Sequence, residues 1–236
     1  MITELLSQSW GFFKIHFNEI VAIIFPFVIP VEVFVALYEY FVLTEHSSFL
    51  DRLVPYAAPF LVYPVFEIAL IFYVASVITD KPISISSALR LGIRFWIPYI
   101  VLTILIILVV GLGIVLLIIP GIYFVLKLLF ASFELLLKGK KPIESLESSW
   151  ERTKGYVGKL LGGGLIIFGI FYIPYWILGS LFDSKTTAYL LFYTMGNILA
   201  SLMGAVFIIF VFRVYWLAGE QHNKSLNTDP SRAGAG

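Results

Sequence analysis

Long runs of apolar residues alternate with short polar segments along most of the chain. Each run approaches or exceeds the roughly 20 apolar residues that a helix needs to cross about 30 Å of hydrocarbon. Polar residues, or in one case a Pro-Gly pair, separate the runs, so the pattern predicts six membrane-crossing helices. These predicted crossings cover residues 20–43, 57–78, 97–119, 121–137, 160–182 and 190–217.

The boundary between the third and fourth crossings is short. Only Pro120-Gly121 interrupts the apolar sequence there. Because proline and glycine are strong turn signals, we expect these two crossings to form a tight helical hairpin.

Composition agrees with a lipid-embedded chain. Of the 236 residues, 60% are hydrophobic and 13% are charged, whereas soluble domains are about 45–50% apolar and about 25% charged. We therefore predict an all-α polytopic protein with a single transmembrane domain over residues 1–218. The polar segment 219–236 contains Pro230 and several glycines, and it predicts a disordered tail.

Lysine and arginine in the loops predict the orientation, because short cytoplasmic loops are enriched in these residues. The two segments 79–96 and 138–159 carry nine of them, and the intervening loops carry only Arg52 and Lys185. We expect the basic loops and both termini to be cytoplasmic. The nine residues are Lys81, Arg90, Arg94, Lys138, Lys140, Lys141, Arg152, Lys154 and Lys159.

An internal repeat organises the chain. Residues 4–17 align with residues 144–157 at an offset of 140, with Glu, Leu, Ser, Trp and Lys at matching positions. A weaker match joins Lys81-Pro82-Ile83 to Lys141-Pro142-Ile143. We predict three parallel repeats of an amphipathic segment plus a helical hairpin, over about 1–78, 79–137 and 138–218. Inverted repeats are commoner than parallel repeats in transporters, so the parallel arrangement argues modestly against a transport function.

The amphipathic segment of the third repeat predicts a helix with one apolar side. Two interpretations of that side remain open. The helix lies in the headgroup plane with Trp150 and Tyr156 as anchors, or it packs against the transmembrane helices of the same chain. The predicted apolar stripe comprises Ile143, Leu146, Trp150, Thr153, Val157 and Leu160.

Three ionisable residues fall well inside predicted crossings, where charge is costly and often functional. Glu32 and Glu67 lie near the middles of the first and second crossings, and Lys127 lies in the fourth. Their similar depth predicts a polar cluster in which Lys127 partners the two glutamates. The cluster is a structural ion pair, a proton or ion path, or a pocket for a lipid headgroup. Prolines within the crossings kink their helices. Two interpretations stay open: the kinks open cavities, or they have no role beyond bending the helix.

Five basic residues are candidate contacts for anionic lipid, since each cation near a charged membrane surface contributes about 1 kcal/mol. They are Lys138, Lys140, Lys141, Arg90 and Arg94.

The sequence offers little for other chemistry. Cysteine is absent, and His16, His46 and His222 are scattered without a metal-binding or hydrolase motif. We expect no catalytic residue, no metal and no cofactor. The net charge of +1 does not point to nucleic acid. We expect membrane lipids as partners, with an unidentified membrane protein as a further candidate.

Residues 118–155 carry a longer motif, with an Ile-Pro-Gly-Ile-Tyr turn, a basic residue, and later Ser-Trp and Lys-Gly pairs. This stretch resembles the YciC-like bacterial membrane proteins and the related glycerophosphoryl diester phosphodiesterase membrane-domain family. The resemblance covers about 38 residues. Ser145-Leu146 replaces an Ala-Leu pair, and Lys127 stands where arginine is more usual. The matching residues are Pro120, Gly121, Tyr123, Lys127, Ser149, Trp150, Lys154 and Gly155.

The resemblance implies a multi-pass protein of the bacterial inner membrane with undefined activity. Some relatives are fused to a phosphodiesterase domain, but these residues lack the clustered Glu and His of that hydrolase. Two functions then compete. The first is a non-catalytic lipid- or partner-interacting component in envelope or lipid homeostasis. The alternative is a transporter for a small hydrophobic or amphiphilic solute that uses Glu32, Glu67 and Lys127. A closed cluster of these three favours the first, and a cavity lined by them favours the second.

Overall fold

The computed structural model describes residues 2–44, 46–183 and 186–227, and these residues form ten helices and no strand. The predicted all-α class is confirmed. The helices are α1 (Ile2–Ile15), α2 (Phe17–Phe41), α3 (Phe49–Ile78), α4 (Ile85–Arg94), α5 (Trp96–Leu116), α6 (Ile118–Leu128), α7 (Ala131–Lys138), α8 (Pro142–Arg152), α9 (Val157–Gly179) and α10 (Thr187–Asn227).

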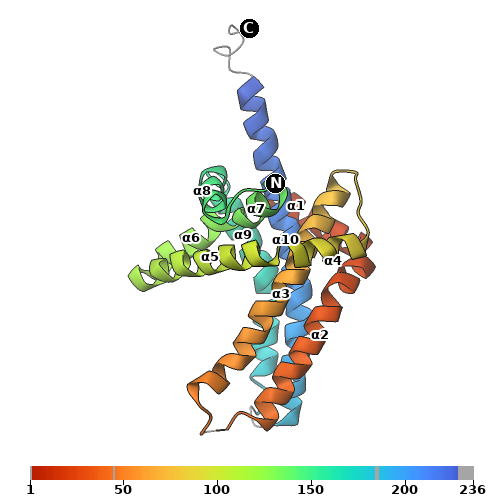
Figure 1. Ribbon diagram of the computed structural model, residues 1–236, viewed down its shortest axis with the longest axis vertical. Coiled ribbons are helices and arrows are strands. Elements are labelled where there is room, and N and C mark those ends of the chain that lie inside the picture. Colours follow the sequence, from red (N-terminus) through yellow and green to blue (C-terminus); the bar gives the residue numbers. More distant parts are fainter. Residues whose placement is uncertain (1, 45, 184–185, 228–236) are drawn as a thin grey trace.

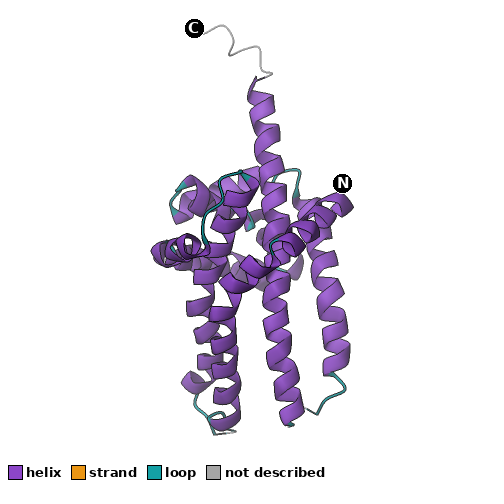
Figure 2. Cartoon of the chain, turned by 90° about the vertical axis from the view of Figure 1, so that its right-hand side faces the viewer, coloured by secondary structure: helices purple, strands orange, loops and turns teal. Residues whose placement is uncertain are grey.

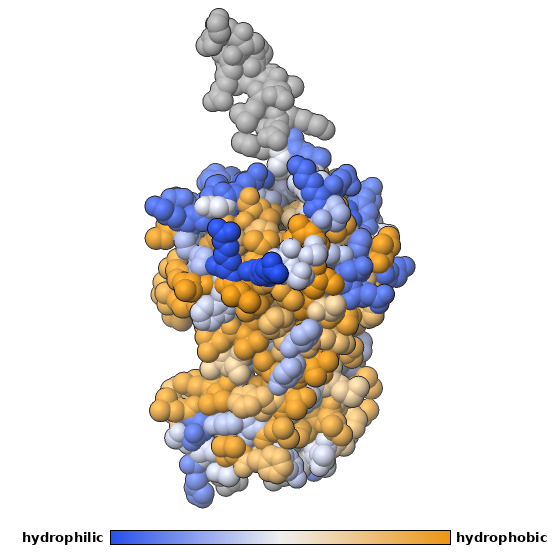
Figure 3. Space-filling model, turned by 45° about the vertical axis from the view of Figure 1, so that its right-hand side comes forward, coloured by the Kyte–Doolittle hydropathy of each residue, from blue (hydrophilic) through white to orange (hydrophobic). Residues whose placement is uncertain are grey.

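Six helical stretches are long and apolar enough to cross a membrane, which confirms a polytopic integral membrane protein. On the face shown in Figure 3, a broad apolar band lies between polar residues gathered toward the two ends of the molecule. The stretches are Phe17–Phe41, Phe49–Ile78, Trp96–Val115, Ile118–Lys138, Val157–Gly179 and Thr187–Gln221.

The second crossing begins earlier than its apolar run predicts. α3 begins at Phe49, eight residues before the predicted start at residue 57. Ser48 and Asp51 form a capping box, in which the Ser48 Oγ accepts from the Asp51 backbone N–H at 3.3 Å. This cap satisfies donors that a helix start otherwise leaves unpaired. Hydropathy does not detect the first residues of α3, because polar residues such as Asp51 and Arg52 interrupt the apolar run there.

The hairpin between the third and fourth crossings is confirmed, but the predicted position of its break is wrong. The chain is extended at Leu117, and Pro120 and Gly121 lie in the first turns of α6. Proline is tolerated in a first turn because its missing N–H would have no helical partner there. Gly121 lets α5 and α6 approach closely, since a Cβ there would collide with Ile114.

The fourth crossing consists of two helices, because α6 ends at Leu128 and α7 begins at Ala131.

At the C-terminal end of the chain, the predicted disordered tail starts too early. α10 continues as helix to Asn227, because a helix propagates easily once formed and no proline occurs before Pro230. The remainder of the predicted tail, 228–236, lies outside the described residues, as does Lys185.

Four of the long helices, α2, α3, α9 and α10, run along the long axis of the molecule (Figure 1). The α5–α6 hairpin instead projects sideways in Figure 1, whereas Figure 2 shows the long helices standing side by side along the long axis. The short helices α1, α4 and α8 gather at one end, whereas the α2–α3 and α9–α10 connections lie at the opposite end. Each short helix precedes a hairpin in the chain. The threefold repeat stays a prediction, since the middle hairpin lies differently.

Close packing holds the four long helices together. Ile23, Ile24 and Ile68 are fully buried, and Phe210 of α10 packs over Gly163 of α9, where any side chain would collide with its ring. In lipid, such van der Waals contacts and small residues at interfaces drive helix association. The bundle thereby fixes the polar side chains that it encloses.

Candidate functional site

Glu32 lies near the middle of α2 and is 6% exposed. Its Oε1 accepts a hydrogen bond from the hydroxyl of Tyr63 on α3. Its Oε2 accepts from the Nδ2 of Asn197 on α10 at 2.9 Å. Both carboxyl oxygens therefore have a donor, as burial in an apolar setting requires.

Glu67 lies one helical turn beyond Tyr63 on α3 and is partly exposed. Its Oε2 accepts from the hydroxyl of Tyr99 at 3.0 Å. Tyr99 belongs to α5, where it is buried. The α5–α6 hairpin thus supplies a hydrogen-bond donor to this second carboxyl group.

The two glutamates line one cavity of about 370 Å³ between α2, α3, α9 and α10. The cavity is polar at the glutamates and aromatic on the side of α9. It is not sealed, because several of its lining side chains are partly exposed. Pro59 also lines it, so a proline of α3 contributes to the cavity wall. Tyr63, Phe66, Phe168, Tyr172, Asn197 and Ser201 complete the principal lining.

The predicted partnership of Lys127 with the glutamates is wrong. Lys127 is 1% exposed and its Nζ donates to the backbone carbonyl of Trp150. The same Nζ lies 5.1 Å from the centre of the Trp150 ring, at cation–π distance. Depth in a straight crossing suggested proximity to Glu32, but α6 lies in the hairpin that projects sideways (Figure 1). Lys127 of α6 therefore contacts the last turn of α8.

Helix α8 packs against the chain's own helices α5, α6, α7 and α10, as the second of the two interpretations predicts. The Ser149 Oγ accepts from the Phe130 backbone N–H at 3.1 Å and donates to the Lys127 carbonyl at 2.7 Å. This serine satisfies backbone groups where α6 gives way to α7. The buried face holds Ser145, Ser149 and Thr153, of which only Thr153 belongs to the predicted stripe. Leu160 of that stripe is also buried, whereas Ile143 is 63% exposed.

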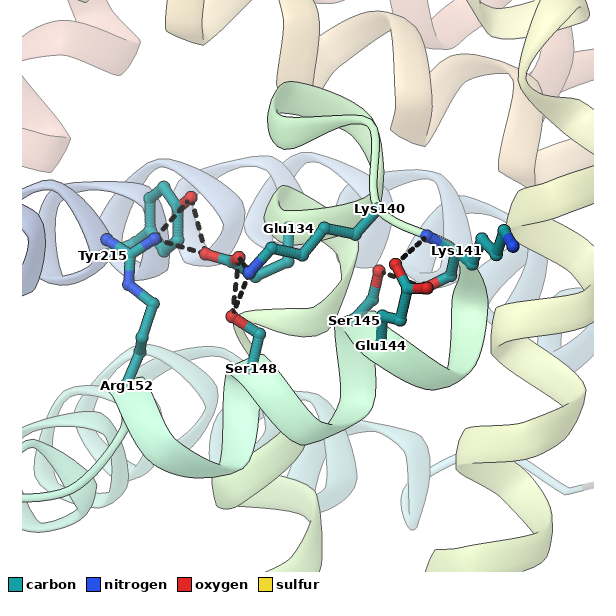
Figure 4. A network of polar contacts seen from close by, with 8 residues as sticks. All are labelled: Glu134, Lys140, Lys141, Glu144, Ser145, Ser148, Arg152 and Tyr215. Atoms are coloured by element: carbon teal, nitrogen blue, oxygen red, sulfur yellow. Dashed lines mark hydrogen bonds and ion pairs between the residues drawn. The ribbon is translucent and has the colours of Figure 1, made fainter.

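A buried carboxylate organises the polar end of the molecule (Figure 4). Glu134 of α7 is fully buried and pairs with Lys140 at 2.7 Å and with Arg152 of α8. It also accepts from Ser148 at 2.7 Å and from the Tyr215 hydroxyl of α10 at 2.9 Å. Four donors can offset the cost of burying this charge. The network ties α7, α8 and α10 together.

The five predicted lipid contacts have different surroundings. Lys140 pairs with Glu134 at 2.7 Å, so part of its charge is already balanced within the protein. Lys141 is exposed at the start of α8, Arg90 is exposed on α4, and the Arg94 guanidinium lies 5.9 Å from the Phe95 ring centre. Lys138 lines a second cavity of about 490 Å³ at the polar end, together with Lys81 and Arg152.

No family model, curated protein or solved structure matches this chain.

Three hydrogen-bond partners of the glutamates carry no charge, so the pattern of charged residues within the crossings does not reveal them. Tyr63, Tyr99 and Asn197 are neutral, and each donates to one of the glutamates. A search for any polar residue within an apolar run would have found Asn197. Among the described residues, no group of three or more His, Cys, Asp or Glu side chains is placed to hold a metal ion.

Proposed function

We propose that this protein is a non-catalytic membrane protein that binds a small amphiphilic molecule in the cavity between α2, α3, α9 and α10. The observation that carries the proposal is that Glu32 and Glu67 line one accessible cavity without Lys127. The sequence left two hypotheses, a lipid- or partner-interacting component and a transporter. This arrangement supports binding of an amphiphilic solute, which is the step that every transporter needs.

The cavity's chemistry favours a ligand whose head group donates hydrogen bonds. Glu32 and Glu67 present carboxyl oxygens, which accept hydrogen bonds and attract cations. The rings of Phe66, Phe168 and Tyr172 line the same space, and aromatic faces attract ammonium groups. An anionic head group would instead meet two carboxyl groups in a setting of low dielectric. A long-chain amine therefore fits best, followed by an alkyl polyol.

An apolar groove adjoins the cavity and fits the rest of such a molecule. It measures about 640 Å³ and runs between α6, α9 and α10. Phe168 and Tyr172 line both the groove and the cavity. A head group at the glutamates could thus extend its alkyl chain past these rings into the groove, with Gly164 and Gly169 leaving room along α9.

The setting proposed for this function is the bacterial inner membrane, with both termini cytoplasmic. The gathering of the short helices and basic segments at one end supports this orientation (Figure 1). Membership of the YciC-like family and the three parallel repeats belong to the same proposal. They rest on the motif in residues 118–155 and on the order of the helices.

A ligand panel tests the proposal. Purified protein in detergent is titrated with dodecylamine, monolaurin and laurate, which share a chain length and differ in head group. We expect binding to weaken in that order. Glu67→Gln should weaken dodecylamine binding at least about tenfold, because a charged partner is lost from a partly desolvated site. Calorimetry measures each affinity.

Glu39→Gln is the matched control, since Glu39 lies on α2 but does not line the cavity. It should bind dodecylamine as the wild-type chain does. Laurate binding as tightly as dodecylamine, or Glu67→Gln leaving the amine's affinity unchanged, would contradict the proposed function.

A further inference from the structure

The second cavity lies at the end of the molecule where the basic segments meet, and it is independent of the cavity at Glu32 and Glu67. It measures about 490 Å³. Its walls come from the end of α3, the α3–α4 connection, α4, α7, α8 and α10. Segments far apart in the sequence therefore build it, and hydropathy alone does not reveal it.

Three cations from three segments line this cavity. Lys81 follows α3 and is exposed, Lys138 ends α7 and is exposed, and Arg152 ends α8. Glu220 also lines the cavity and accepts from the Trp216 Nε1 at 3.1 Å. The lining thus holds three positive side chains and one negative side chain. Two of the cations are flexible lysines that can reach toward a bound anion.

Arg152 is held in place before any ligand arrives. Its Nη1 donates to Glu134 and, at 2.9 Å, to the Tyr215 hydroxyl, and its guanidinium lies 4.3 Å from the Tyr215 ring centre (Figure 4). Gly139, with φ of 67°, ends α7 and turns the chain so that Lys140 also reaches Glu134. The buried carboxylate thereby fixes one wall of the cavity, while Lys81 and Lys138 complete the positive charge.

The remaining wall is apolar. Phe72 of α3, Leu137 of α7 and Phe212 of α10 line it, and Trp216 stands beside them. A site for a freely hydrated anion has no need of such a surface. Cations beside apolar side chains, at the polar end of a membrane-spanning bundle, match an anionic head group attached to an acyl chain.

We propose that this cavity binds a phosphate ester, and that its chemistry suits the head group of an anionic phospholipid. Arginine and lysine are the usual partners of phosphate oxygens, the first through a planar fork and the second as a point charge. The two cavities then select opposite charges, with donor head groups at Glu32 and Glu67 and phosphate at Lys81, Lys138 and Arg152.

Binding of dihexanoyl phosphatidic acid and of glycerol 3-phosphate to the full chain in detergent tests this site. The double variant Lys81→Gln/Lys138→Gln should bind the lipid about 30-fold more weakly, because each lysine contributes roughly one factor of five. Lys141→Gln/Lys159→Gln is the matched control. It removes two basic residues of the same end that do not line the cavity, and its affinity should stay within about twofold of wild type.

The two ligands separate the possible sources of phosphate. Lipid binding without glycerol 3-phosphate binding identifies a phospholipid head group, whereas equal binding of both identifies a soluble phosphate ester; both results support the site. Binding of neither ligand, or equal losses in the double variant and the control, overturns it. Dodecylamine binding in the same preparations reports separately on the proposed function. Thermal unfolding confirms that both variants are folded.

Discussion

Replacing Glu134 with alanine is expected to lower the free energy of unfolding by about 3–5 kcal/mol, because it removes the buried partner that two partly exposed cations share. Glu134 is fully buried and pairs with both Lys140 and Arg152. Ser148 and Tyr215 would lose their acceptor as well. Denaturant unfolding in mixed micelles measures the change.

Glu151→Ala is the control for this prediction. Glu151 pairs with Lys154 at 2.5 Å, but both side chains are more than half exposed, at 63% and 65%. Exposed ion pairs contribute about 0–1 kcal/mol, so this variant should unfold nearly as the wild type does. Equal stabilities of the two variants would mean that the Glu134 network does not hold α7, α8 and α10 together.

Lys127→Glu is expected to be similarly severe, lowering the free energy of unfolding by about 3–5 kcal/mol through an uncompensated buried charge. The Lys127 Nζ faces the carbonyl of Trp150 in the last turn of α8. That end of a helix carries partial negative charge, which stabilises a cation and repels a carboxylate. The same unfolding measurement applies.

Two further variants separate this account from a pairing with the glutamates. Lys127→Met keeps the length of the side chain and should cost only about 1–2 kcal/mol, the contribution of the dipole and of the Trp150 ring. Combining Lys127→Glu with Glu67→Lys should not restore stability. Recovery in that charge swap would show that Lys127 and Glu67 are partners after all.

The sequence predicts the crossings well because the bilayer imposes a minimum length on each apolar run. It predicts their ends less well, since caps such as Ser48 with Asp51 are polar and local. The hairpin turn shows the same limit. Pro120 and Gly121 correctly indicate a hairpin, but they lie within α6, and the break falls at Leu117, where no residue type signals it.

The candidate site was only partly predictable for a different reason. Glu32 and Glu67 stand out because charge is rare within crossings, and the structure brings them to one cavity. Lys127 stands out equally but lies elsewhere, because depth along a helix does not fix the tilt or the neighbours of that helix. Tilt depends on packing between helices, which a uniformly apolar sequence does not encode.

Charge counting reached a similar limit at the polar end. The excess of lysine and arginine indicates which loops share a side, but it does not distinguish paired from unpaired residues. Lys140 pairs with Glu134, whereas Lys138, only two residues earlier in the sequence, lines a cavity. Lys81 and Arg152 join Lys138 only through the fold, so no local motif identifies their shared site.

Photolabelling tests the central claim most directly, namely that the cavity at Glu32 and Glu67 holds the head group of an amphiphile. A dodecylamine analogue with a diazirine near the amine is irradiated with the protein in lipid, and labelled peptides are mapped by mass spectrometry. We predict labels on Tyr63, Tyr172 or Asn197 that excess dodecylamine removes. Labels confined to lipid-facing residues such as Ile97 and Val115, which are 68% and 84% exposed, and unaffected by competitor, would contradict the account.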